Sequence, residues 1–283
     1  MRPEVSVETC PVQVIEVPTQ DGKHATVAVR KPPGKGPFPA AIYLHGTLES
    51  KEANKLSHSL KDQTGSRFLA AGYVTVAATF RSRSSDPLTR DALEDCLAVV
   101  THVKKIPNVD PQSVVMWGDS GGGSLVLELA GETTLCAVTA CEPATVLFTG
   151  LYSKENLGSK PPFSAASGIK IMEDPKAYYT PELQKRTRDK IARIRCPVFI
   201  AHGDRHIINK VNNEVFVPEM TSAQKLTQVI LYPGGGHSFS HAGKPELTQK
   251  FFDDCHAFFR KYLPTQPIPL EESLITQVPA GQQ

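Results

Sequence analysis

The sequence lacks several features that would assign it to a specialised class of protein. Lysine and arginine number 31 against 29 aspartates and glutamates, and a net charge of +2 offers no broad field for nucleic acid or an anionic membrane. No run of about 18 apolar residues could span a membrane, and the N-terminus lacks the charged start and apolar core of a signal peptide. We therefore expect a soluble, cytoplasmic protein with no nucleic-acid partner and no membrane span.

Cysteine pairs with metal-binding or redox spacing are also absent. The six cysteines are scattered without a CxxC pair, and most lie in apolar patterns, where a thiol behaves as a small hydrophobic group. Cys136 and Cys141 lie five residues apart on one expected strand, so they point to opposite faces and cannot form a disulfide with each other. We expect reduced cysteines, no metal and no cofactor.

Eight segments rich in β-branched residues are present: 12–17, 24–30, 40–46, 73–80, 113–118, 135–141, 196–203 and 227–232. The first two alternate like half-exposed antiparallel strands, whereas several later ones are continuous apolar runs, typical of buried parallel strands. Helical periodicity lies between the later strands, most clearly from Asp91 to Pro107 and after Pro245. This alternation predicts an α/β fold with a mostly parallel eight-stranded sheet and helices on both faces.

The 283 residues suit one large domain, which we expect over residues 1–263. Residues 144–190 form a long excursion after the sixth strand, and we expect this insertion to act as a cap over the active site. The proline-rich tail, residues 264–283, is too short for a domain, and we expect it to lie on the surface.

The segment "VVMWGDSGGG" (114–123) carries the clearest catalytic pattern. Its GDSGG core fits both chymotrypsin-like proteases and the GxSxG nucleophile elbow between a strand and a helix. An apolar strand precedes Ser120 and a helical pattern follows it, which favours the elbow. The elbow exposes the serine hydroxyl, and the helix N-terminus places the Gly121 N–H where an oxyanion would form.

Two further loops supply candidates for the remaining machinery. His45-Gly46-Thr47 follows the third strand, so the Thr47 N–H is the best candidate for a second oxyanion donor and Leu48 the next. We expect His45 to hold this loop through local backbone contacts. A serine needs a nearby base, and His237 lies in "YPGGGHSFS" between the last strand and the last helix. Other histidines, including His241, fall at positions expected to be exposed.

The chain order, the His-Gly loop, GxSxG and the final GGGH resemble the α/β-hydrolase superfamily. The segment "ALEDCLAVVTHVKKIPNVDPQSVVMWGDSGGG" is similar to prolyl oligopeptidase and dienelactone hydrolase relatives, and the resemblance covers roughly residues 25 to 263. It argues against the chymotrypsin alternative, whose triad follows the order His, Asp, Ser. It also implies a serine hydrolase that uses Ser120 and His237.

The acid of the triad departs from these relatives, which carry it about three residues after the glycine of the seventh strand. In "AHGDRHIIN" that place holds His206, and the carboxylate lies earlier, at Asp204. Glu142, at the end of the sixth strand, is an equally ranked alternative, because one helix and one strand separate it from Ser120. His206 itself ranks third, and an acid-free, slower triad remains open.

The leading hypothesis is an esterase for small or medium-sized substrates that acts through an acyl-enzyme, as a monomer or homodimer. Alternatives are a prolyl oligopeptidase-type peptidase, for which no gating domain is recognisable beside the core, and a catalytically impaired binding protein. A metal hydrolase using His202, Asp204 and His206 is less favoured. Arg81 follows the fourth strand and is a candidate clamp for a substrate carboxylate, although pairing within its own loop is the simpler interpretation.

Overall fold

The computed structural model describes residues 7–46, 53–81, 88–152, 166–237 and 239–270. In these residues eight strands form one sheet, as the alternation of apolar segments predicted, and their order is β1-β2-β4-β3-β5-β6-β7-β8. The strands are β1 (Gln13–Pro18), β2 (His24–Arg30), β3 (Phe38–Leu44), β4 (Val74–Ala78), β5 (Val109–Asp119), β6 (Val138–Cys141), β7 (Val198–Gly203) and β8 (Thr227–Tyr232).

The sheet is antiparallel at one side and parallel in the rest. β1 pairs with β2 and β2 with β4 in antiparallel register, whereas the pairs from β4 through β3 to β8 are parallel. Leu44 pairs with Gly118, and Cys141 pairs with both Asp119 and Ala201. The carboxyl ends of β3, β5, β6 and β7 therefore meet at one edge, and the chain leaves this edge at Ser120, Glu142 and Asp204.

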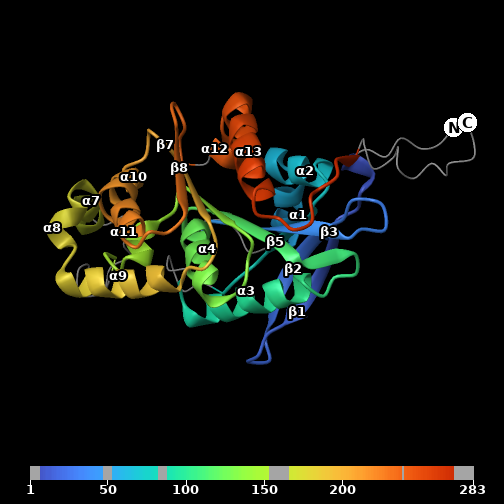
Figure 1. Ribbon diagram of the computed structural model, residues 1–283, viewed down its shortest axis with the longest axis horizontal. Coiled ribbons are helices and arrows are strands. Elements are labelled where there is room, and N and C mark those ends of the chain that lie inside the picture. The colour runs from blue at the N-terminus through green and yellow to red at the C-terminus, as the bar shows by residue number, and fades with distance from the viewer. Residues whose placement is uncertain (1–6, 47–52, 82–87, 153–165, 238, 271–283) are drawn as a thin grey trace, which may run out of the picture.

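Helices cover both faces of the sheet (Figure 1). The helices outside the excursion are α1 (Ala53–Lys61), α2 (Gln63–Ala70), α3 (Arg90–Val103), α4 (Gly121–Glu132), α10 (Ile208–Val211), α11 (Val217–Ser222), α12 (Phe239–Ala242) and α13 (Pro245–Arg260), with a 3-10 turn at Val7–Thr9 and a π-helical segment at Asn212–Phe216. One apolar cluster joins the strands to α3 and α4, and a second joins them to α1, α2 and α13. Successive strand residues alternate between the clusters: Met116 lies in the first and Trp117 in the second.

The excursion between β6 and β7 builds a smaller apolar cluster of its own. It contains α5 (Thr145–Phe148), α7 (Ala166–Glu173), α8 (Pro175–Tyr178) and α9 (Pro181–Arg193). Val146, Ile171 and Leu183 pack there with Ile208 and Val215 from the segment after β7. The excursion thus has helices and a core of its own, and its role as a cap stays a prediction.

Three smaller features also bear on the expectations. The start of the tail packs on the domain, because the Thr265 N–H donates to Ser113 Oγ over 2.8 Å and Leu270 is buried. All six cysteines are free thiols. None of the helices in the described ranges is long and apolar enough to cross a membrane.

Candidate active site

Ser120 lies at a strained turn between β5 and α4. Its backbone has φ 52° and ψ −116°, outside the regions that a residue with a side chain ordinarily occupies. The Ser120 N–H donates to the Cys141 carbonyl over 2.9 Å, and the Ala144 N–H donates to the Ser120 carbonyl over 2.9 Å. The segment after β6 therefore holds the turn in place from one side.

The glycines around Ser120 are required by close backbone approach. A Cβ at Gly118 would collide with the Gly122 carbonyl, and a Cβ at Gly122 would collide with the carbonyl oxygens of Leu44 and His45. Only glycine lets α4 begin so close to the ends of β3 and β5. The two glycines of the GxSxG pattern thus provide the close packing that a nucleophile elbow needs.

His45 and Gly46 follow β3, and the His45 carbonyl lies close to Gly122 at the start of α4. Gly121 is the first residue of α4, whose N-terminal N–H groups carry a partial positive charge. His45 is buried, its Nδ1 lies 2.7 Å from the Gly46 carbonyl, and its ring stacks on Phe80 at 4.5 Å. These local contacts agree with the expected role of His45 in holding the loop, which stays a prediction, while Thr47 and Leu48 lie outside the described residues.

Glu142 is brought next to His237 by contacts between backbone segments far apart in the sequence. Glu142 is fully buried with φ 46°, and its Oε1 accepts the backbone N–H of Gly203 at the end of β7. Its Oε2 lies 3.5 Å from Nδ1 of His237, whose side chain is 35% exposed. Since a Cβ at Gly203 would collide with the Gly235 carbonyl, glycine also lets the His237 loop approach β7.

His206 stacks on His237 instead of contacting it as an acid would. The ring centroids are 4.2 Å apart and the planes differ by 25°. Burial lowers the pKa of His206, and the neighbouring His237 lowers it further, against the opposing effect of Glu142. The structure thus places His206 over the face of the His237 ring, while Glu142 faces its Nδ1.

Asp204 is directed toward a different partner. Its Oδ1 accepts the backbone N–H of Gly234 over 2.9 Å, and the residue is exposed. Gly234 has a φ of 78°, so this contact supports the turn that precedes His237. Among the described residues, the carboxylate that meets the His237 ring is Glu142, and the alternating set of His202, Asp204 and His206 does not converge on one point.

Ser120 and His237 are linked through the segment after β6. The Cys141 carbonyl at the end of β6 and the Ala144 N–H just after it hold the Ser120 backbone, and Glu142 between them contacts the His237 ring. Within the described part of the chain, no hydrogen bond joins the Ser120 hydroxyl to His237. Hydrogen bonds between catalytic groups are often long without substrate, so this contact belongs to the proposal below.

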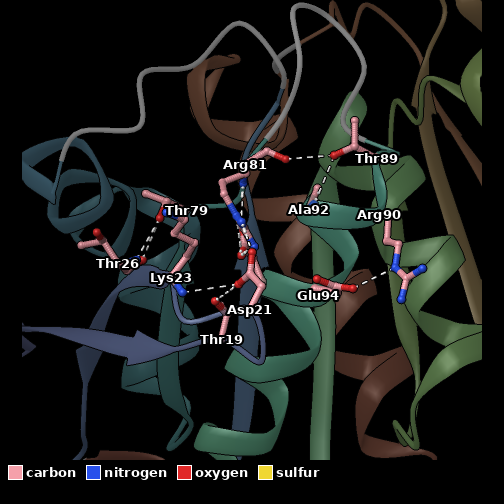
Figure 2. A network of polar contacts seen from close by, with 11 residues as sticks. Thr19, Asp21, Lys23, Thr26, Thr79, Arg81, Thr89, Arg90, Ala92 and Glu94 are labelled. Atoms are coloured by element: carbon pink, nitrogen blue, oxygen red, sulfur yellow. Dashed lines mark hydrogen bonds and ion pairs between the residues drawn. The ribbon is translucent and has the colours of Figure 1, made fainter.

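Arg81 is occupied by two carboxylates. Its Nε and Nη2 lie 2.9 and 2.7 Å from Asp95 Oδ1. Its Nη1 lies 2.5 Å from Asp21 Oδ2, and Figure 2 shows Arg81 and Asp21 directed toward each other. The Arg81 N–H also donates to Asp95, and Thr89 donates to the Arg81 carbonyl. The guanidinium thus joins β4 to α3 and the β1–β2 turn, and we do not assign it to substrate binding.

A second histidine and carboxylate pair lies beside Ser120, and the sequence analysis missed it. Asp119, the residue before Ser120, is buried; it accepts the Ser240 hydroxyl over 2.6 Å and lies 3.3 Å from Nδ1 of His241. Burial opposes ionisation of Asp119, but hydrogen bonds from His241, Ser240 and Tyr43 outweigh it and lower the pKa. His241 was expected to be exposed, yet its side chain is 25% exposed and paired.

The comparisons with known proteins agree with this architecture. Residues 72–266, more than half of the chain, match the prolyl oligopeptidase family. The chain belongs to that family. This prolyl oligopeptidase family member also resembles an esterase from Pseudomonas putida ECU1011 in structure, with a TM-score of 0.66, 15% identity and coverage of 93% of this chain and 86% of that one. The likeness shows the α/β-hydrolase fold.

Two curated proteins resemble this family member in sequence. The quorum-quenching protein AidA of Acinetobacter baumannii is 31% identical over 142 residues, which cover 40% of this chain and 47% of AidA. The 2,6-dihydropseudooxynicotine hydrolase of Paenarthrobacter nicotinovorans is 27% identical over 191 residues, which cover 65% and 48%. The chain thus spans about half the length of the curated relatives it matches.

Proposed function

We propose that this prolyl oligopeptidase family member is a serine hydrolase that cleaves carboxylic esters of small or medium-sized molecules. One observation carries the proposal: a strained serine at the end of β5 lies beside a segment whose buried Glu142 faces His237. A serine hydroxyl is a poor nucleophile near neutral pH unless a base removes its proton. On this basis we assign Ser120 as nucleophile, His237 as base and Glu142 as the acid that orients the base.

The reaction proceeds in two halves. Nε2 of His237 takes the Ser120 proton as the oxygen attacks the ester carbonyl, and the Gly121 N–H stabilises the oxyanion. Thr47, the candidate for a second donor, lies outside the described residues. His237 then protonates the leaving alcohol, which leaves an acyl group on Ser120. Water, deprotonated by His237, attacks this acyl-enzyme; the carboxylic acid leaves and the Ser120 hydroxyl is restored. Glu142 holds the proton on Nδ1 and stabilises the imidazolium formed in each half.

The names of the similar proteins support hydrolysis and favour esters over other substrates. One curated relative is a hydrolase, and the structural neighbour from Pseudomonas putida is an esterase. The family match keeps peptide cleavage as a second candidate, since the family takes its name from an oligopeptidase. Both reactions use the same nucleophile, base and oxyanion donors, so substrate preference alone separates them.

The proposal is tested by a panel of p-nitrophenyl esters and a proline-containing peptide p-nitroanilide, together with a fluorophosphonate probe. We expect the probe to label wild type and not Ser120→Ala, and esters to be cleaved in preference to the peptide. Labelling together with preferred cleavage of the peptide would replace the esterase by a peptidase. Failure of the probe to label wild type would contradict any serine hydrolase.

A further inference from the structure

We infer that Glu142, His206 and His237 form a binding site for a divalent transition-metal ion such as Zn²⁺. One ligand atom from each residue lies within 4.8 Å of the other two, and this is the group of three that the described residues bring together. Two histidines and one glutamate are a known ligand set for zinc, with a fourth position left for water. An ion bound to His237 would prevent this residue from acting as the proposed base, so it would inhibit ester hydrolysis.

The carboxylate of the site is already held in place. Oε1 of Glu142 accepts the Gly203 N–H, which leaves Oε2 directed toward His237. Glu142 is fully buried, so its side chain has little freedom left to lose when an ion binds. A buried carboxylate oxygen that is held in place beside a partly exposed imidazole favours a cation there.

The two imidazoles lie on the side of the site from which an ion would enter. The His237 side chain is 35% exposed and His206 is partly buried, so an ion can reach the pair from solvent. Ligand atoms around one tetrahedral zinc ion lie roughly 3.3 Å apart, so the stacked rings must tilt to bring their nitrogens closer by up to about 1.5 Å. One hydrogen bond resists this movement of the His206 ring: its Nδ1 accepts the Ile208 N–H. At 3.3 Å this hydrogen bond is long and therefore weak.

Binding of the ion and its effect on activity are separable. The site depends on the three side chains alone, whereas inhibition rests on the proposed function, because the ion removes His237 from use as base. Phenylalanine at position 206 keeps an aromatic ring over His237 and removes both ligand nitrogens. His206→Phe is therefore the informative variant. Its activity with zinc is compared with its own activity in EDTA, so any change in basal activity does not enter the comparison.

The test is titration calorimetry with ZnCl₂ at pH 7.5, followed by the zinc concentration that halves ester hydrolysis. We expect one zinc ion per wild-type chain, reversal by EDTA, and at least tenfold weaker binding and inhibition for His206→Phe. His102→Gln and Cys136→Ser, which change a histidine and a partly exposed thiol elsewhere, should stay within twofold of wild type.

Two outcomes would overturn the inference: no stoichiometric zinc binding, or equal binding by wild type and His206→Phe. Binding that depends on His206 in a protein without esterase activity would support the ion site. That outcome would count against the proposed function alone. Circular dichroism of His206→Phe shows whether a loss of binding reflects unfolding.

Discussion

Two histidine and carboxylate pairs flank Ser120, and they differ in what surrounds them. In the first pair, Glu142 uses one oxygen on a backbone N–H and presents the other to His237 over 3.5 Å. In the second pair, Asp119 is contacted by His241 over 3.3 Å and by Ser240. The first pair joins two loops at the sheet edge, whereas the second fastens α12, which begins two residues after His237, to the elbow.

The comparison teaches that a position next to Ser120 in the chain does not decide which histidine we propose as its base. Asp119 precedes Ser120 in the chain, yet its carboxylate accepts bonds from α12, on the side of the sheet that α1, α2 and α13 cover. The second pair therefore acts as a positioning element for the segment that carries His237. The first pair has a partly exposed ring and a buried carboxylate, as an acid and base couple requires.

The largest expected effect separates the two histidines. His237→Gln removes the proposed base and should lower kcat for a p-nitrophenyl ester by about 10⁴-fold or more. His241→Gln leaves the base in place, and its loss should stay within about tenfold. Steady-state rates on both variants, with circular dichroism to show that each is folded, check the prediction. Comparable losses in the two variants would erase the distinction between the pairs.

The second effect concerns stability and belongs to Asp119. Asp119→Asn leaves a buried amide against Ser240 and His241, and should lower the free energy of unfolding by about 2 to 3 kcal/mol. The matched control is Asp189→Asn on α9, where an exposed pair with Lys185 should contribute less than about 0.5 kcal/mol. Urea denaturation measures both. An Asp119→Asn variant as stable as its control would mean that α12 is held by other contacts.

A smaller effect should appear in the pH dependence of stability. Burial raises the pKa of Asp62 to about 7, against the opposing effects of the Gly65 N–H and of His241. Between pH 4 and 7 Asp62 keeps its proton in the folded chain but releases it in the unfolded chain. The free energy of unfolding therefore falls as the pH rises through this range. Asparagine keeps the acceptor for Gly65 and does not titrate.

We therefore expect Asp62→Asn to gain about 2 kcal/mol relative to wild type between pH 4 and pH 8. Urea denaturation at several pH values measures this difference. A constant difference across that range would show that Asp62 titrates normally in the folded protein.

The sequence predicted the fold well because strand periodicity is a local property. All eight strands lie within a few residues of the predicted segments, and the bounds of β2 and β8 agree with them. Ser120 could be placed at a strand-to-helix turn for the same reason. The structure adds that the glycines at 118 and 122 of the GxSxG pattern permit close backbone approach.

The acid could not be chosen from the sequence, because the choice depends on tertiary contacts. Glu142 and Asp204 both follow strands that end at the same edge. What separates them is the left-handed backbone of Glu142, its bond to Gly203 and the turn that engages Asp204. The pair of Asp119 and His241 was missed because it depends on a contact between distant parts of the chain. Asp119 and Ser240, the neighbour of His241, are 121 residues apart, and no local pattern indicates that α12 contacts Asp119.

The most direct measurement of the central claim compares Glu142→Gln with Asp204→Asn. Glutamine can still accept the Gly203 N–H, but its amide would donate to Nδ1 of His237 and fix the wrong tautomer. We expect kcat for ester hydrolysis to fall by about 10³-fold or more in Glu142→Gln and by less than about tenfold in Asp204→Asn. Full activity in Glu142→Gln together with its loss in Asp204→Asn would contradict the account.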